Sequence, residues 1–190
     1  MGETPTLLLH GALALVPAIA LLAALVFVDS FRLVRPTFVL WMLVAGAIAA
    51  GIALLVNSAA IGVLDLSFVT YARALAPPLE EALKAALIVV LIRREHVGFV
   101  VDAAIAGFAI GAGFAIVENL QYLRLADDAG LSTWLVRGFG TALMHGGATA
   151  VFGVMAISIL ERRPPAGWLA FVPGYGLAVV LHAEIGRAHV

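Results

Sequence analysis

Apolar residues occur along this chain in long, almost continuous segments separated by short polar stretches. Five such segments lie at about residues 7–28, 37–56, 79–92, 98–123 and 133–160. A sixth, at about 168–183, is shorter than the roughly 20 residues that cross a bilayer. Helices satisfy backbone polar groups in lipid, whereas barrel strands show a two-residue alternation that is absent from this sequence. The pattern predicts an all-α, polytopic transmembrane helical bundle with five full spans and a clipped sixth, forming a single membrane domain over residues 1–183.

The stretch 57–78 is less apolar and contains Asp65 and Arg73. We expect a loop with a short interfacial helix there. Pro77 and Pro78 then suit the first turn of the third spanning helix.

Composition narrows the class of protein. The chain is 63% hydrophobic and 12% charged, against about 45–50% and 25% in soluble domains, which excludes a water-soluble globular protein and a disordered one. With no cysteine, disulfides and thiolate chemistry are excluded. No basic patch supports nucleic-acid binding. The first apolar run lacks a basic flank and is too long for a signal peptide, so we expect it to be retained as a helix.

Arginines in the short loops predict the orientation, because cytoplasmic loops carry the excess of positive charge. The loops that follow the first, third and fifth apolar segments contain most of these arginines. We therefore expect these loops to be cytoplasmic and the N-terminus to lie outside. These arginines are Arg32, Arg35, Arg93, Arg94, Arg162 and Arg163, against Arg73 and Arg124 on the opposite side.

Ionisable residues inside apolar helices are costly and are therefore candidates for function. They are Glu80, Glu81, Lys84, Asp102, Glu118, Arg137, His10, His145 and His182. The helix directions place most of them in the outer half of the bilayer, with Asp102 at the cytoplasmic end. At spacings of three and four residues, Lys84 is able to pair with either glutamate. A glutamate beside a like charge in a buried site is poised as a general base.

Structural explanations stay open for each feature. The Glu80 to Lys84 cluster also suits a helix start, and Glu118 with Asn119 suits a helix end. His10 and His145 are also explained as packing histidines. Asp102 is a candidate partner of Arg93 or Arg94, and Arg137 either snorkels or anchors a carboxylate. Glycines at 107, 111, 146 and 147 favour close helix approach.

The last seven residues, EIGRAHV (184–190), match the translation of a sequencing adapter, GAG ATC GGA AGA GCA CAC GTC. We interpret them as a non-native tail that replaces the natural continuation after Ala183. An independent sequence of the locus that retained them would refute this interpretation.

Four features together resemble the PrsW family of intramembrane proteases, within the wider superfamily of CAAX-type membrane proteases. APPLEEALK (76–84) matches the EExxK motif, and GFAIVENLQY (113–122) matches the FxxxEN motif. Arg137 and His145 share a later helix, and LHA (181–183) matches the start of the terminal histidine motif, in which an asparagine normally follows. The resemblance covers residues 76–183.

The resemblance implies a bacterial inner-membrane endopeptidase that cleaves membrane-anchored regulatory proteins of the anti-sigma-factor type. Glu80 or Glu81 would activate water, while His145 and Glu118 share the proton transfers. Asn119 or His182 would donate to the oxyanion, and Lys84 would hold the carboxylates. No cofactor is implied, although zinc is not excluded.

Two alternatives have different consequences. A non-proteolytic scaffold or immunity-type protein of the same superfamily would not need Glu81, Glu118 and His145. A small transporter would favour inverted repeats, which the sequence does not show.

Overall fold

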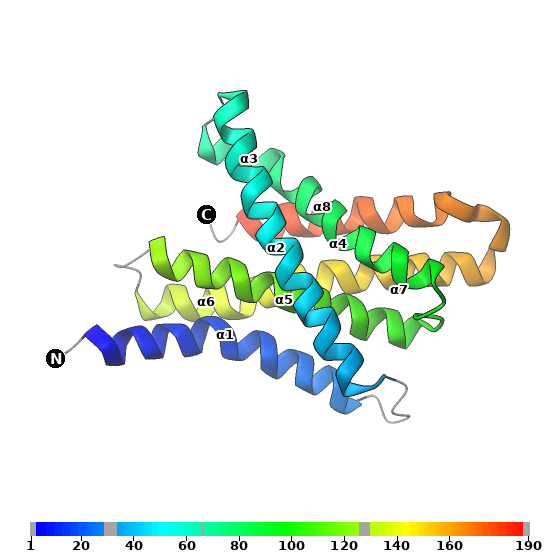
Figure 1. The fold of residues 1–190 in the computed structure, drawn as a ribbon, viewed down its shortest axis with the longest axis horizontal. Helices are drawn as coiled ribbons and strands as arrows, with labels where there is room; N and C mark the ends of the chain where they lie inside the picture. Colours follow the sequence, from blue (N-terminus) through cyan, green and yellow to red (C-terminus); the bar gives the residue numbers. More distant parts are fainter. Residues whose placement is uncertain (1–2, 29–33, 66, 126–129, 188–190) are drawn as a thin grey trace.

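A computed structural model describes residues 3–28, 34–65, 67–125 and 130–187, and within these ranges the chain is helical with no β-strand. Figure 1 shows a bundle in which α5 and α7 lie side by side while α2 crosses them diagonally. The elements are α1 (Glu3–Val28), α2 (Pro36–Leu64), α3 (Phe68–Ala74), α4 (Ala76–Arg93), α5 (Val100–Leu125), α6 (Leu131–Thr141), a π-helical turn (Ala142–Gly147), α7 (Ala148–Arg162), a 3-10 turn (Pro164–Phe171) and α8 (Val172–Arg187). The all-α membrane class is therefore confirmed.

In the described residues, five segments are long and apolar enough to cross a membrane. The predicted number is confirmed, but one member of the set differs. The sixth apolar segment, which was expected to be too short, lies within Pro164–Arg187 and is long and apolar enough to cross a membrane. The helix α4 is not in this set. Its 18 residues carry Glu80, Glu81, Lys84 and Arg93, which are more charges than an apolar span has, although α4 runs across the bundle beside α2 and α8 (Figure 1). The five segments are Leu8–Phe27, Pro36–Leu64, Val100–Leu125, Leu131–Arg162 and Pro164–Arg187.

The region between α2 and α4 contains the short helix expected there. The helix α2 extends further than predicted, to Leu64, and α3 follows with Ser67 as its N-cap. The Ser67 hydroxyl accepts a hydrogen bond from the Thr70 amide, which satisfies one of the free amides of the first turn. Two prolines open α4 as predicted.

Helix α5 lies at the centre because its small residues let neighbouring helices approach closely. A methyl group on Gly107 would collide with the backbone of Thr149 and Ala150, and one on Gly111 would collide with the carbonyl of His145. The predicted role of this glycine pair in close packing is confirmed, and it brings α5 against the segment that carries His145.

The predicted helix 133–160 is interrupted in its middle. Residues Ala142–Gly147 form a π-helical turn between α6 and α7. Such turns are rare and occur often at functional sites. This one contains His145, and the apolar periodicity of the sequence did not reveal it.

Candidate functional site

Five of the predicted site residues lie in one connected cluster at the junction of α4, α5, α8 and the π-helical turn. They are Glu80, Glu81, Glu118, His145 and His182. Of the supporting residues, Lys84 and Arg137 join this cluster, whereas Asn119 lies outside it. Residues separated by about a hundred positions in sequence therefore meet in space.

The innermost layer consists of Glu81, Lys84 and His145, which are all at most 1% exposed. The Lys84 ammonium donates to Glu81 Oε1 at 2.5 Å and to His145 Nδ1 at 2.9 Å. It also lies 4.6 Å from the centre of the Phe114 ring. Because a lysine only donates, Nδ1 of His145 is an acceptor, and its Nε2 carries the proton and donates to Glu118. We call these three residues the buried layer.

Glu118 connects the buried layer with a cavity. One of its oxygens accepts the hydrogen bond from His145, and the other accepts one from Arg137 Nη2 at 2.8 Å. The Arg137 guanidinium stacks on the Tyr122 ring at 3.8 Å. Arg137 therefore anchors a carboxylate, which was one of the two roles left open for it.

Glu80 and His182 face each other at the cavity. Nε2 of His182 lies 3.7 Å from Glu80 Oε2, while its Nδ1 lies 2.7 Å from Glu81 Oε1. Since the Glu81 carboxylate is ionised beside Lys84 and only accepts, Nδ1 of His182 is the donor. The lone pair of Nε2 therefore points toward Glu80.

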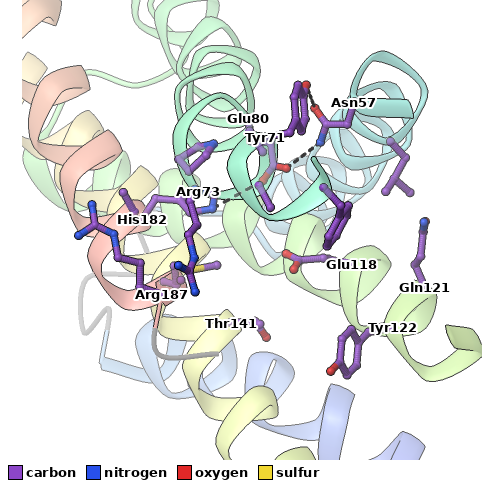
Figure 2. Close-up of a pocket in the computed structure, with 18 of the residues that line it drawn as sticks. Asn57, Tyr71, Arg73, Glu80, Glu118, Gln121, Tyr122, Thr141, His182 and Arg187 are labelled. Carbon is purple, nitrogen blue, oxygen red and sulfur yellow. Dashed lines mark hydrogen bonds and ion pairs between the residues drawn. The ribbon is translucent and has the colours of Figure 1, made fainter. Parts of the chain in front are cut away.

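The cavity has a volume of about 440 Å³, and Figure 2 shows residues that line it. Glu80, Glu118 and His182 reach it, and we call them the cavity-facing layer. Glu81, Lys84 and His145 do not line it. The two layers thus divide the predicted catalytic residues into those that can touch a bound molecule and those that lie behind them.

Comparison with known proteins identifies the family. Residues 34–184 match the model of the PrsW family, described as intramembrane metalloproteases. The chain belongs to the PrsW family. Searches of curated proteins and of solved structures gave no match. The family consists of intramembrane proteases, so the cluster is a candidate protease active site in a multi-pass membrane protein.

The metal in the description of the PrsW family can be tested against the side chains. Glu80, His145 and His182 each offer a ligand atom within 4.8 Å of the others, and one carboxylate with two imidazoles is a donor set used by catalytic zinc. His182 backed by Glu81 has the form of a metal-binding histidine held by a carboxylate. The donor set therefore fits zinc in type. His145 would first have to exchange its contact with Lys84 or Glu118.

Asn119 does not reach the cavity. Its amide donates to the Ala14 carbonyl and to the Thr141 hydroxyl, each at 2.8 Å, and it is fully buried. It ties α5 to α1 and α6, and both of its donor hydrogens are used there. Of the two residues to which the PrsW resemblance implied an oxyanion role, His182 lines the cavity and Asn119 does not.

Two polar residues at the site were not singled out from the sequence. Asn57 on α2 donates from Nδ2 to Glu80 Oε1 at 3.0 Å, and the Tyr71 hydroxyl on α3 donates to Asn57 Oδ1 at 2.8 Å. The signal for Asn57 was a lone amide in an apolar helix. Nothing in the sequence distinguishes Tyr71.

Other candidate residues lie away from the PrsW site. His10 stacks on Trp134 at 5.6 Å between ring centres, in agreement with a packing role. The expected ion pair of Asp102 with Arg93 or Arg94 is absent among the described residues, and Arg93 stacks over Trp168. Oδ1 of Asp102 is buried without a hydrogen-bond partner in the described part of the chain. Arg32, used for the orientation, lies outside the described residues.

Proposed function

We propose that this PrsW-family protein is an endopeptidase that cleaves single-span, membrane-anchored regulatory proteins of the anti-sigma-factor type, with Glu80 activating the attacking water. The observation that carries this proposal is the Glu80–His182 pair at the wall of the cavity. A carboxylate with an available oxygen beside an imidazole is suited to general acid–base chemistry.

Glu80 is favoured over Glu81 because their surroundings differ. Oε1 of Glu81 already accepts hydrogen bonds from Lys84 and His182. Oε2 of Glu80 accepts no hydrogen bond from the described residues, although His182 lies 3.7 Å away. A base must reach the proton that it removes, and of these two glutamates Glu80 alone lines the cavity.

In the proposed reaction Glu80 Oε2 takes a proton from water while the water oxygen bonds to the scissile carbonyl carbon. His182, held by Glu81, is placed to accept this proton from Glu80 at Nε2 and to pass it to the leaving amine. Breaking the C–N bond then releases the amine with that proton and leaves a carboxylic acid. Lys84, His145 and Glu118 are positioning residues that hold Glu81 and the cavity wall.

The proposed proton transfers need no resident metal. When zinc is bound, Glu80, His145 and His182 would hold it, and it would supply Lewis-acid polarisation of the scissile carbonyl.

The charges of the loops support a location for the reaction. Arg93 and Arg94 follow α4 on the predicted cytoplasmic side, so Glu80 near the start of α4 lies toward the outside. We propose cleavage in the outer half of a bacterial inner membrane, with the N-terminus of the protease outside.

The proposal is tested with membranes of a bacterial host that express the protein or its Glu80→Gln variant. New N-termini of single-span membrane proteins are mapped by mass spectrometry. We expect cleavage sites near the outer membrane surface that disappear in Glu80→Gln. Cleavage that persists in Glu80→Gln, and likewise in Glu118→Ala and His145→Ala, would contradict the proposal and favour a scaffold role.

A further inference from the structure

The short helix α3 and the end of α2 have no role in the site described so far, yet both contact it. Asn57 belongs to α2 and Tyr71 to α3, and both line the cavity beside Glu80. Figure 2 shows the two hydrogen bonds that run from Tyr71 through Asn57 to Glu80.

We propose that Asn57 and Tyr71 are positioning residues that orient the Glu80 carboxylate for the reaction, an inference that rests on the proposed function. Asn57 binds Oε1, which leaves Oε2 as the oxygen that faces His182. Because the contact uses one oxygen of the carboxylate, it sets the rotation of the group as well as its position.

The orientation of the Asn57 amide is itself fixed. The Glu80 carboxylate accepts, so the NH₂ group is the end that faces it, and Oδ1 is left to accept the hydrogen bond from the Tyr71 hydroxyl. A flipped amide would place Oδ1 against the carboxylate and lose the hydrogen bond to Glu80. Tyr71 is 3% exposed, and the capped helix α3 holds it in place.

Asn57 lies one residue past the predicted end of α2 at residue 56, and the observed helix continues through it to Leu64. The inference holds whether Glu80 acts on water directly or holds a metal, because either role needs Oε2 to face the cavity beside His182.

The experiment uses the full protein in vesicles, with a single-span protein whose Glu80-dependent cleavage has been established as the substrate. Asn57→Asp keeps the side-chain shape and the acceptor for Tyr71 but sets an oxygen against Glu80. We expect kcat to fall about 10- to 100-fold with KM nearly unchanged, because the reacting group is misplaced while the cavity keeps its shape. Tyr71→Phe should lower kcat less, by about 3- to 10-fold, since it acts through Asn57.

Two comparisons separate positioning from packing. A packing role predicts that Asn57→Ala is more harmful than the nearly isosteric Asn57→Asp, whereas positioning predicts that Asn57→Asp is at least as harmful. In the Asn57→Ala background, Tyr71→Phe should have little further effect. Matched controls are Val56→Ala, on an exposed part of α2, and Tyr175→Phe, which removes a tyrosine hydrogen bond to the Pro78 carbonyl.

The outcomes are distinct. Wild-type kcat in both Asn57→Asp and Tyr71→Phe, while Glu80→Gln is inactive, would overturn this inference and leave the proposed function standing. A rise in KM at constant kcat would also overturn it, because it would assign the two residues to substrate binding. Full cleavage by Glu80→Gln would instead refute the proposed function.

Discussion

Glu80 and Glu81 are adjacent in sequence but belong to different regions of the site. Glu81 lies in the buried layer with Lys84 and His145, where each charge has a partner and no atom reaches the cavity. Glu80 lies in the cavity-facing layer with His182 and Glu118, where donors and acceptors remain available to a bound molecule.

This difference indicates which layer determines the stability of the protein and which determines its turnover. A buried ion pair that loses one partner leaves an uncompensated charge, which is strongly destabilising. A group at a cavity wall is solvated when its partner is lost, so its removal affects chemistry more than folding. We therefore expect stability to depend on the buried layer and turnover on the cavity-facing layer.

The largest effect on stability is expected from Lys84→Met. This change leaves Glu81 charged and buried, and it removes the donor to His145. We expect a loss of about 3–5 kcal/mol in the free energy of unfolding, measured by SDS titration of the protein in mixed micelles with circular dichroism. The control Arg124→Met changes an exposed charge and should stay within about 0.5 kcal/mol. Equal stability of Lys84→Met and the parent would remove the distinction between the layers.

The comparison of Glu80→Gln with Glu81→Gln tests whether the cavity-facing layer affects turnover and the buried layer affects stability. Glu80→Gln should lower the cleavage rate about 100- to 10,000-fold, the range for loss of a general base, with unfolding changed by less than about 1 kcal/mol. Glu81→Gln should instead destabilise the fold, because Lys84 loses its counter-charge. Rates come from the substrate cleavage assay and stabilities from the SDS titration. The reverse pattern would assign the base to Glu81.

The sequence alone predicted the membrane class and the cluster of ionisable residues well. Long apolar runs leave few alternatives to helices, and charges inside them are rare enough to mark a site. The spacing of Lys84 allowed an ion pair with either Glu80 or Glu81, and the structure forms the pair with Glu81.

What remained hidden depends on contacts between helices. Choosing between Glu80 and Glu81 needs the position of α8, because His182 contacts both. The sequence placed Asn119 at the site, but its amide donates hydrogen bonds to α1 and α6 instead. The π-helical turn at His145 left no mark on the apolar pattern, because its residues are as apolar as their neighbours.

Gly111→Ala tests whether stability and cleavage also require the close contact between α5 and the backbone of the π-helical turn. The added methyl group would meet the His145 carbonyl, and overpacking of this kind costs about 1–3 kcal/mol. We expect lower stability and lower cleavage together, because His145 and its contacts move. Gly51→Ala is the matched control, since no atom lies near a methyl group there. A Gly111→Ala protein of unchanged stability would show that the π-helical turn adapts freely.

The smallest effect on cleavage is expected from removal of metal, because only the cavity-facing layer offers available donor atoms. Of the three metal donors, Glu80 and His182 present available atoms, whereas both ring nitrogens of His145 are engaged by Lys84 and Glu118. The Lys84 ammonium also repels a cation at this position. A site with two available donors holds zinc less firmly than the usual three protein ligands, so we expect treatment with 1,10-phenanthroline to change cleavage by less than about twofold. Metal content is measured on the same sample, so that retained activity refers to protein without zinc. Loss of cleavage that returns with added zinc would show that His145 releases one of its partners, and the boundary between the two layers would then shift to include it.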